Sequence, residues 1–167
     1  MKKVFLAVFL ILVGLIAPGA CIVKSFQFIQ QCAGYLKQAA DANSAELSLE
    51  RLNLAIDYVE KHGLTDGYTS VLWKTEDENI GYWYRNLKTC QSELEGCLEA
   101  SQLEKSNVLM KVRESLTDDS KDGTSLTVPS GISRYPNNGA WGWARFFSYL
   151  FILAGLCLCA CAYENAS

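Results

Sequence analysis

Few side chains in this 167-residue chain could take part in covalent chemistry, and none of them forms a recognisable catalytic set. The chain has one histidine, His62, which excludes a multi-histidine metal site, and the common nucleotide-binding, hydrolase and zinc-protease motifs do not occur. A cation in the last turn of a helix explains His62 as well as catalysis does, because the helix dipole favours positive charge there. We therefore predict no enzyme, no cofactor and no metal ion.

The chain has seven cysteines: Cys21 in the first apolar segment, and two groups of three, 32/90/97 and 157/159/161. Those of the CxCxC run at 157–161 lie in an apolar segment, where small apolar side chains in a membrane helix are the simplest interpretation and metal binding or acylation the alternatives. Cys90 and Cys97 are about 10.5 Å apart along one predicted helix, which is too far for them to bridge each other. A disulfide from Cys32 to Cys90 or to Cys97 remains a candidate in an oxidising compartment.

Aromatic residues concentrate between positions 62 and 84, and they form the candidate interaction surface: Tyr68, Trp73, Tyr82, Trp83 and Tyr84. Residues 82–84 are consecutive, so on a helix their side chains point in three directions. Core packing explains these rings by default, and a partner-binding patch is the alternative. The chain has a net charge of −3 and no basic stripe, which argues against nucleic acid as a partner.

Two apolar segments at the chain ends predict a membrane protein. Residues 4–23 are uncharged and long enough to cross the hydrocarbon core, which needs about 20 residues. Segment 1–23 is a retained anchor, a cleaved signal, or a lipid-modified segment with acylation at Cys21; its residues fit all three, and we favour the anchor. Residues 140–163 form the second span, with Trp141, Trp143 and Arg145 at its interfacial end and a short tail, 164–167.

The charges that flank the first span give an orientation. Lys2, Lys3 and the amino terminus favour a cytoplasmic N-terminus, although Arg145 and Glu164 around the second span favour the opposite. The first span usually dominates. We therefore predict a cytoplasmic-membrane protein whose central domain is extracytoplasmic, in the periplasm, and whose termini are cytoplasmic.

Apolar residues recur at helical spacing in three stretches of the central domain, 24–116. They predict helices at about 22–41, 44–62 and 76–116, with capping boxes at Asn43 and Thr75 and a helix stop at Gly63. The first stripe runs on from the membrane span: Ile22, Phe26, Ile29, Ala33, Leu36 and Ala40. The predicted fold is all-α, with N- and C-terminal transmembrane helices flanking an antiparallel three-helix extracytoplasmic bundle.

The third predicted helix is too long for its neighbours. Its distal part, from about residue 101, lacks an intramolecular partner, which predicts either fraying or a homo-oligomer that forms through it. Residues 117–139 are rich in Gly, Ser, Asp, Asn and Pro and predict a flexible linker back to the membrane. Because the first helix leaves the membrane and the second returns, the aromatic turn should lie at the membrane-facing end of the bundle.

Residues 64–87 resemble a stretch of small bacterial membrane proteins, with the pattern LTxGYTSxLxxTPxEDxxFWYxNL. The matching positions are Leu64, Thr65, Gly67, Tyr68, Thr69, Ser70, Leu72, Thr75, Trp83, Tyr84, Asn86 and Leu87. Glu76 stands where proline is common, and Tyr82 stands where phenylalanine is common. The resemblance covers 26 to about 94. It implies a bacterial membrane protein with a helical extracytoplasmic domain, and it supplies no activity.

These features predict a membrane-anchored helical interaction or assembly module. Its partners would be the lipid bilayer and a membrane or periplasmic protein. The alternative is a sensor-like domain that signals through its first span to a membrane partner, since the heptad stripe continues out of that span.

The predicted orientation can be tested with a cysteine introduced within residues 120–135. A membrane-impermeant maleimide added from the periplasmic side of the cytoplasmic membrane should label this cysteine, and addition from the cytoplasmic side should not. The parent chain, treated in the same way, controls for its own seven cysteines. Labelling from the cytoplasm alone would show that the orientation is reversed.

Overall fold

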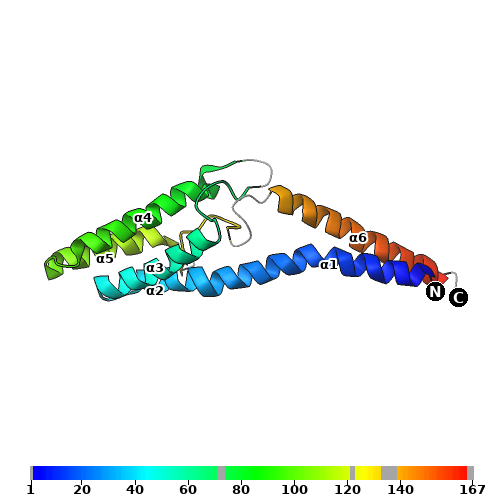
Figure 1. The fold of residues 1–167 in the computed structure, drawn as a ribbon, viewed down its shortest axis with the longest axis horizontal. Helices are drawn as coiled ribbons and strands as arrows, with labels where there is room; N and C mark the ends of the chain where they lie inside the picture. The colour runs from blue at the N-terminus through cyan, green and yellow to red at the C-terminus, as the bar shows by residue number, and fades with distance from the viewer. Residues whose placement is uncertain (1, 71–73, 121–122, 133–138, 165–167) are drawn as a thin grey trace.

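Two apolar helices at the chain ends lie side by side, and a helical bundle extends from them (Figure 1). A computed structural model describes residues 2–70, 74–120, 123–132 and 139–164. Its elements are α1 (Lys2–Phe28), π-helix η1 (Ile29–Ala33), α2 (Gly34–Ala40), α3 (Ala45–Lys61), 3-10 helix η2 (Glu76–Glu78), α4 (Ile80–Cys97), α5 (Gln102–Leu116), β1 (Thr117–Ser120), β2 (Gly123–Leu126) and α6 (Gly139–Glu164). The chain is mostly helical, and two of its helices are long and apolar enough to cross a membrane.

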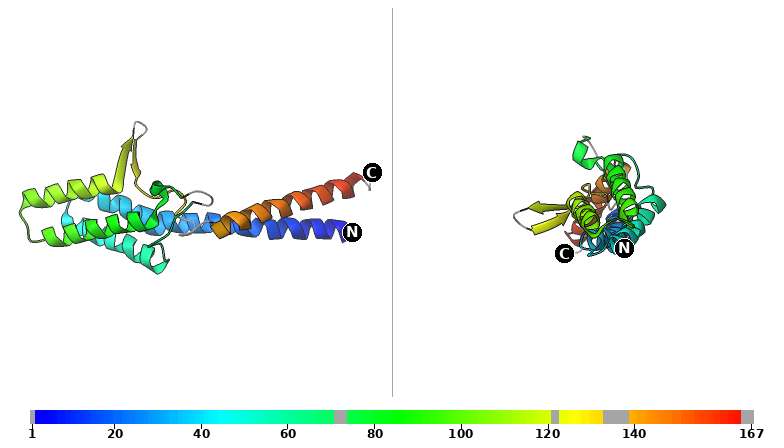
Figure 2. Two further views of the ribbon diagram at one scale, coloured as in Figure 1. Left: turned by 90° about the horizontal axis from the view of Figure 1, so that it is seen from above. Right: turned by 90° about the vertical axis from the view of Figure 1, so that its left-hand side faces the viewer.

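Glycines let α1 and α6 approach each other closely. A Cβ atom built on Gly14 would lie 2.8 Å from the carbonyl oxygen of Ser148, and one built on Gly155 would lie 2.8 Å from that of Ala7. Each helix thus places two small residues seven positions apart on the contact face. Small residues permit the close backbone approach by which membrane helices associate without a hydrophobic driving force. The pair is antiparallel, so both chain ends lie at one end of the molecule (Figures 1 and 2).

Gly14→Ala should destabilise the α1–α6 pair, because the added methyl group overlaps a backbone oxygen that cannot move alone. Overpacking of this kind typically costs about 1–3 kcal/mol. Thermal unfolding of the full chain in detergent should show a lower Tm for Gly14→Ala. Gly19→Ala is the matched control on α1, since nothing lies within 4 Å of a Cβ built there. Equal Tm values for the two variants would contradict the close contact.

One unbroken helix leads from the first span into the bundle, and its buried face differs from the predicted stripe. Phe28, Cys32 and Leu36 are buried, whereas Ile22, Phe26 and Ile29 are exposed. The spacing of the buried residues is four and four, while an α-helix needs about 7.2 residues for two turns. The π-helix accommodates the additional residue, and the backbone N–H of Gly34 bonds the carbonyl of Ile29 five positions earlier.

The second predicted helix, 44–62, appears as α3, with a shifted cap. Ser44 rather than Asn43 accepts the capping hydrogen bond, from the backbone N–H of Leu47 at 3.2 Å. At the other end Gly63 has a φ of 66°, in the left-handed region. The backbone N–H of Leu64 then bonds the carbonyl of Val59 at 2.8 Å, as in a Schellman motif.

The single helix predicted for 76–116 is wrong. The chain reverses after Cys97, and α5 runs back along α4 with its inner face on α2 and α3 as well. Ser101 caps α5 by accepting a hydrogen bond from the N–H of Glu104, and S-x-x-E is a helix-start signature that the periodicity concealed. The bundle therefore has four helices, and α5 finds an intramolecular partner that the sequence did not predict.

The four helices share one apolar core. Leu36 of α2, Leu52 of α3, Leu94 of α4 and Val112 of α5 are all fully buried in it. Val112 belongs to the segment expected to fray or to contact another chain. Its burial removes the reason for that expectation, because the inner face of α5 is already covered.

The predicted flexible linker, 117–139, is also wrong for its described part. β1 and β2 form an antiparallel hairpin with Thr117 opposite Leu126, and Figure 2 shows it projecting from the bundle. Ile132, which follows, is buried in the core. The sequence carries an Asp122-Gly123 pair, a common hairpin-turn signal, and Gly123 has a φ of 124°. A strictly all-α description therefore omits this hairpin.

Candidate interaction cleft

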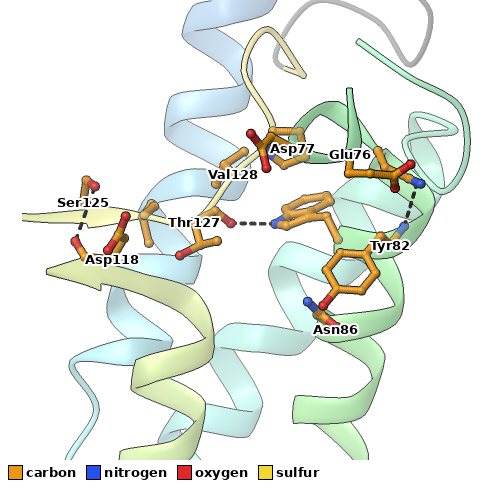
Figure 3. A pocket seen from close by; sticks show the side chains of 12 residues that line it. Glu76, Asp77, Tyr82, Asn86, Asp118, Ser125, Thr127 and Val128 are labelled. Atoms are coloured by element: carbon orange, nitrogen blue, oxygen red, sulfur yellow. Dashed lines mark hydrogen bonds between the residues drawn. The ribbon is translucent and has the colours of Figure 1, made fainter. Parts of the chain in front are cut away.

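A cleft of about 590 Å³ lies between the start of α4 and the hairpin, and Figure 1 shows these elements at the end of the bundle nearest α6. One wall comes from η2 and α4: Glu76, Asp77, Asn79, Tyr82, Trp83 and Asn86. The other comes from Asp118 of β1 and from residues 125–129 of β2 and the segment after it. Figure 3 shows Tyr82 and Asn86 facing the cleft from the helix side, with Asp118 and Ser125 on the hairpin side.

The helix wall owes its shape to two consecutive caps. Thr75 Oγ1 donates to Glu78 Oε2 at 2.8 Å, which is the box pairing predicted for these residues, but it precedes the short helix η2. Asn79 caps α4 itself, because its Oδ1 accepts a hydrogen bond from the N–H of Tyr82 at 3.0 Å. The additional turn moves the start of α4 to Ile80 and leaves Tyr82 on the open side, 58% exposed.

Trp83 joins the two walls. Its ring is buried, with 5% of the residue exposed, and its indole N–H donates to the carbonyl of Thr127 at 2.9 Å. The backbone N–H of Thr127 in turn donates to the carbonyl of Leu116 at the end of α5. Residues 126–132, which we call the strap, are thus fixed to α4 and α5 (Figure 3). Of the consecutive aromatic residues 82–84, Trp83 is therefore the buried one, Tyr84 is partly buried against the core, and Tyr82 is exposed.

Tyr68 lies next to the cleft through its contact with Asn79. The two residues form an isolated β-bridge, and Asn79 Nδ2 donates to the Tyr68 hydroxyl at 3.3 Å. The ammonium group of Lys74 lies 5.1 Å from the centre of the Tyr68 ring, within cation–π range. The segment before α4 therefore supports, through the contact of Tyr68 with Asn79, the wall of the cleft that carries Tyr82.

Tyr84 points away from the cleft toward α3. Its hydroxyl donates to Glu60 Oε1 at 2.6 Å, and this hydrogen bond raises the pKa of Tyr84 to about 12. Trp73, the remaining candidate, lies outside the described residues. The structure thus brings Tyr82 and Trp83 together in the cleft, places Tyr68 behind one wall, and separates Tyr84 from them.

The cleft is acidic. Glu76, Asp77 and Asp118 line it, and the lining contains no Lys, Arg or His in the part of the chain that the structure describes. The sequence did not predict the hairpin wall, because residues 118 and 125–129 lie in the stretch that is predicted to be a flexible linker. Apolar residues alternate at Leu126 and Val128, and a turn signal, Asp122-Gly123, precedes them. This pattern is typical of the second strand of a hairpin.

No protein family, curated protein or solved structure matches this chain. The resemblance of residues 64–87 to small bacterial membrane proteins stays a prediction. What the chain does has to be inferred from the cleft and from its position beside the two apolar helices.

His62 and the cysteines, the other side chains that could take part in chemistry, make contacts that a structural role explains. His62 Nδ1 lies 2.8 Å from the carbonyl of Tyr58, and the two rings stack at the end of α3. No disulfide joins any two cysteines of the described residues, so neither candidate pairing, Cys32–Cys90 or Cys32–Cys97, is formed in this structure. Cys32 Sγ faces the carbonyl of Ala55 on α3 at 3.9 Å, while Cys97 Sγ bonds the carbonyl of Leu94 on its own helix.

Trp83→Phe should loosen the strap, because it removes the indole donor and leaves the Thr127 carbonyl without that hydrogen bond. A neutral hydrogen bond contributes about 1 kcal/mol, so backbone amides of residues 126–132 should exchange roughly fivefold faster. Hydrogen exchange of the full chain, read by mass spectrometry, measures this. Tyr84→Phe also removes one hydrogen bond from α4 but none from the strap, and exchange there should not change. Unchanged exchange in Trp83→Phe would show that the strap is held by its apolar contacts alone.

Proposed function

We propose that this protein is a membrane-anchored interaction module whose cleft binds a membrane or periplasmic protein partner. The observation that carries the proposal is the cleft itself. Its walls come from segments far apart in the chain, and the hydrogen bond from Trp83 to Thr127 joins them. The exposed Tyr82 ring forms part of one wall. Tyr is enriched in binding surfaces because its ring is apolar and its hydroxyl is polar.

The side chains of the cleft favour binding over catalysis. Its polar groups are carboxylates, amides and the hydroxyls of Ser125, Thr127 and Tyr82. Neither hydroxyl of Ser125 or Thr127 has a histidine, lysine or cysteine beside it among the lining residues described, so no activated nucleophile results. Binding needs only the shape and charge that are present.

The two apolar helices set where binding would occur. α1 and α6 are proposed to anchor the chain in the cytoplasmic membrane, with the bundle on the extracytoplasmic side. The elements that line the cleft, the start of α4 and the segment after β2, lie at the end of the bundle nearest α6 (Figure 1). A partner that is itself membrane-anchored, or that lies close to the membrane surface, could reach the cleft.

A sensor-like role is the second candidate, and the unbroken helix from Lys3 to Ala40 favours it. The π-helix Ile29–Ala33 lies where this helix enters the bundle, and Phe28 just before it contacts the Tyr58 ring of α3. π-helices are rare and often occur at functional sites. A signal in the bundle could pass to α1 through this contact, and a membrane partner would then relay it.

A homo-oligomer through the distal third helix remains a third proposal, now restricted to the outer face of α5. Leu103 and Met110 are seven residues apart on this helix and are 73% and 59% exposed. They are two isolated apolar side chains on an otherwise polar face. The cleft is better formed as a binding site, so we place the main partner there.

Photo-cross-linking in living cells tests the cleft. A photoreactive phenylalanine analogue replaces Tyr82 in the cleft, Leu54 as an exposed control on α3, or Leu103 on α5. Position 82 should give a discrete cross-linked product with another protein, and position 54 should not. Loss of that product in the Trp83→Phe background would place the partner in the cleft. Identical products from positions 82 and 54 would contradict the proposal, and a product at twice the chain's mass from position 103 would indicate a homo-oligomer.

A further inference from the structure

We infer that the cleft binds a short, extended segment of the partner protein that carries lysine or arginine side chains. This inference rests on the proposed function and adds the chemistry of the segment that is recognised. Three properties of the cleft support it: its size, its charge and its position on the anchored molecule.

The size of the cleft fits a short segment. Its volume of about 590 Å³ falls in the range of pockets that enclose small ligands, roughly 300–1,000 Å³. A rigid protein–protein interface needs about 800 Å² on each partner, which is more than this concave surface offers. A few residues in extended conformation would fit between α4 and the strap, with Leu126, Val128 and Pro129 against their aliphatic parts.

The charge of the cleft selects a cation. Glu76, Asp77 and Asp118 come from opposite walls, and none of them is in a salt bridge within the described residues. The exposed Tyr82 ring offers a π face on which a guanidinium or ammonium group can lie. Carboxylates bond such groups through charge-assisted hydrogen bonds, which are about twice as strong as neutral ones. An anionic or neutral segment would leave the carboxylates desolvated without a partner.

The charge and the position of the cleft argue against two other occupants, anionic lipid headgroups and a second copy of this chain. Anionic lipid headgroups would be repelled by the same carboxylates. A second copy has cations in the groove lined by Lys37 and Arg51, but that groove lies at the turn between α2 and α3, which Figure 1 shows at the end of the bundle farthest from α6. Copies anchored in one membrane would stand in the same orientation, so this groove of one copy would not meet the cleft of the next. We therefore assign the cleft to a separate protein, and a cross-linked product at twice the chain's mass from position 82 would show a second copy instead.

Peptide binding to the full chain in phosphatidylcholine nanodiscs tests the inference. The probes are three acetylated, amidated peptides that differ only in side-chain charge: GRGRGRG, GQGQGQG and GEGEGEG. The arginine peptide should bind saturably and at least about tenfold more tightly than the glutamine peptide, and the glutamate peptide should not bind. Added salt should weaken the binding. Equal affinity for the arginine and glutamine peptides would overturn the inference.

Two charge-removing variants locate the binding. Glu76→Gln/Asp77→Asn/Asp118→Asn should lower affinity for the arginine peptide about tenfold or more. Glu95→Gln/Glu99→Gln/Glu104→Gln removes the same charge from exposed positions around the turn between α4 and α5, at the far end of α4 from the cleft, and should leave affinity within about twofold, as expected for screened distant charges. Equal loss in both variants would mean general attraction to an acidic protein and would overturn the inference.

Tyr82→Leu gives an independent measurement if the triple variant unfolds. It keeps an apolar side chain at an exposed position but removes the π face, and it should weaken arginine-peptide binding severalfold while circular dichroism shows unchanged helix content. Unchanged affinity in Tyr82→Leu would count against a cation on this ring. Failure of the charge preference alone would leave the proposed function standing, since cross-links from position 82 would persist in the carboxylate variant.

Discussion

The close contact of α1 with α6 is the constraint on which the rest of the fold depends. With the backbones brought together at Gly14 and Gly155, the chain must leave the end of α1 and come back to the start of α6 at the same place. An even number of passes between the two apolar helices meets this condition. α2 runs outward, α3 returns, α4 runs outward and α5 returns (Figure 1). A three-helix bundle would have left the chain at the remote end, with only the linker to bring it back.

The same constraint explains why the strap is ordered. After α5 the chain is already near the end of the bundle closest to α6, so the hairpin and residues 126–132 can pack on the bundle rather than cross a long distance. The Trp83–Thr127 bond and the burial of Ile132 fix this segment beside the start of α4. The cleft is therefore a consequence of the route the chain takes back to α6. Its two walls are the hairpin with the segment that follows it, and the first residues of α4 with the short helix η2 before them.

Local signals in the sequence were sufficient wherever one short motif determines the structure. The apolar segments, the stop at Gly63 and the extent of α3 follow from composition, a left-handed glycine and one stripe. The apolar periodicity gave the wrong buried face or the wrong helix end where the packing partners of a helix change along its length. The π-helix shifts the buried face after Phe28, and α5 has apolar residues on both faces, so the end of α4 looked like a continuation. The hairpin was missed because its polar strands depend on a tertiary contact, the bond from Trp83, that lies 44 residues away.

Among the proposed functions, the chain path favours the interaction module over the sensor. The strap, which forms one wall of the cleft, leads along the chain into α6, whereas the other wall belongs to α4. Among the residues that the structure describes, none of those that line the cleft belongs to α1, η1 or α2. A ligand in the cleft could influence α1 through α4 and α3, by way of contacts such as that between Tyr58 and Phe28, or through the strap and α6, which packs on α1. Because a ligand shifts an equilibrium only by its difference in affinity for two states, signalling by either route would require the bundle to have two arrangements. Binding requires only the single arrangement that the four helices and the strap already provide.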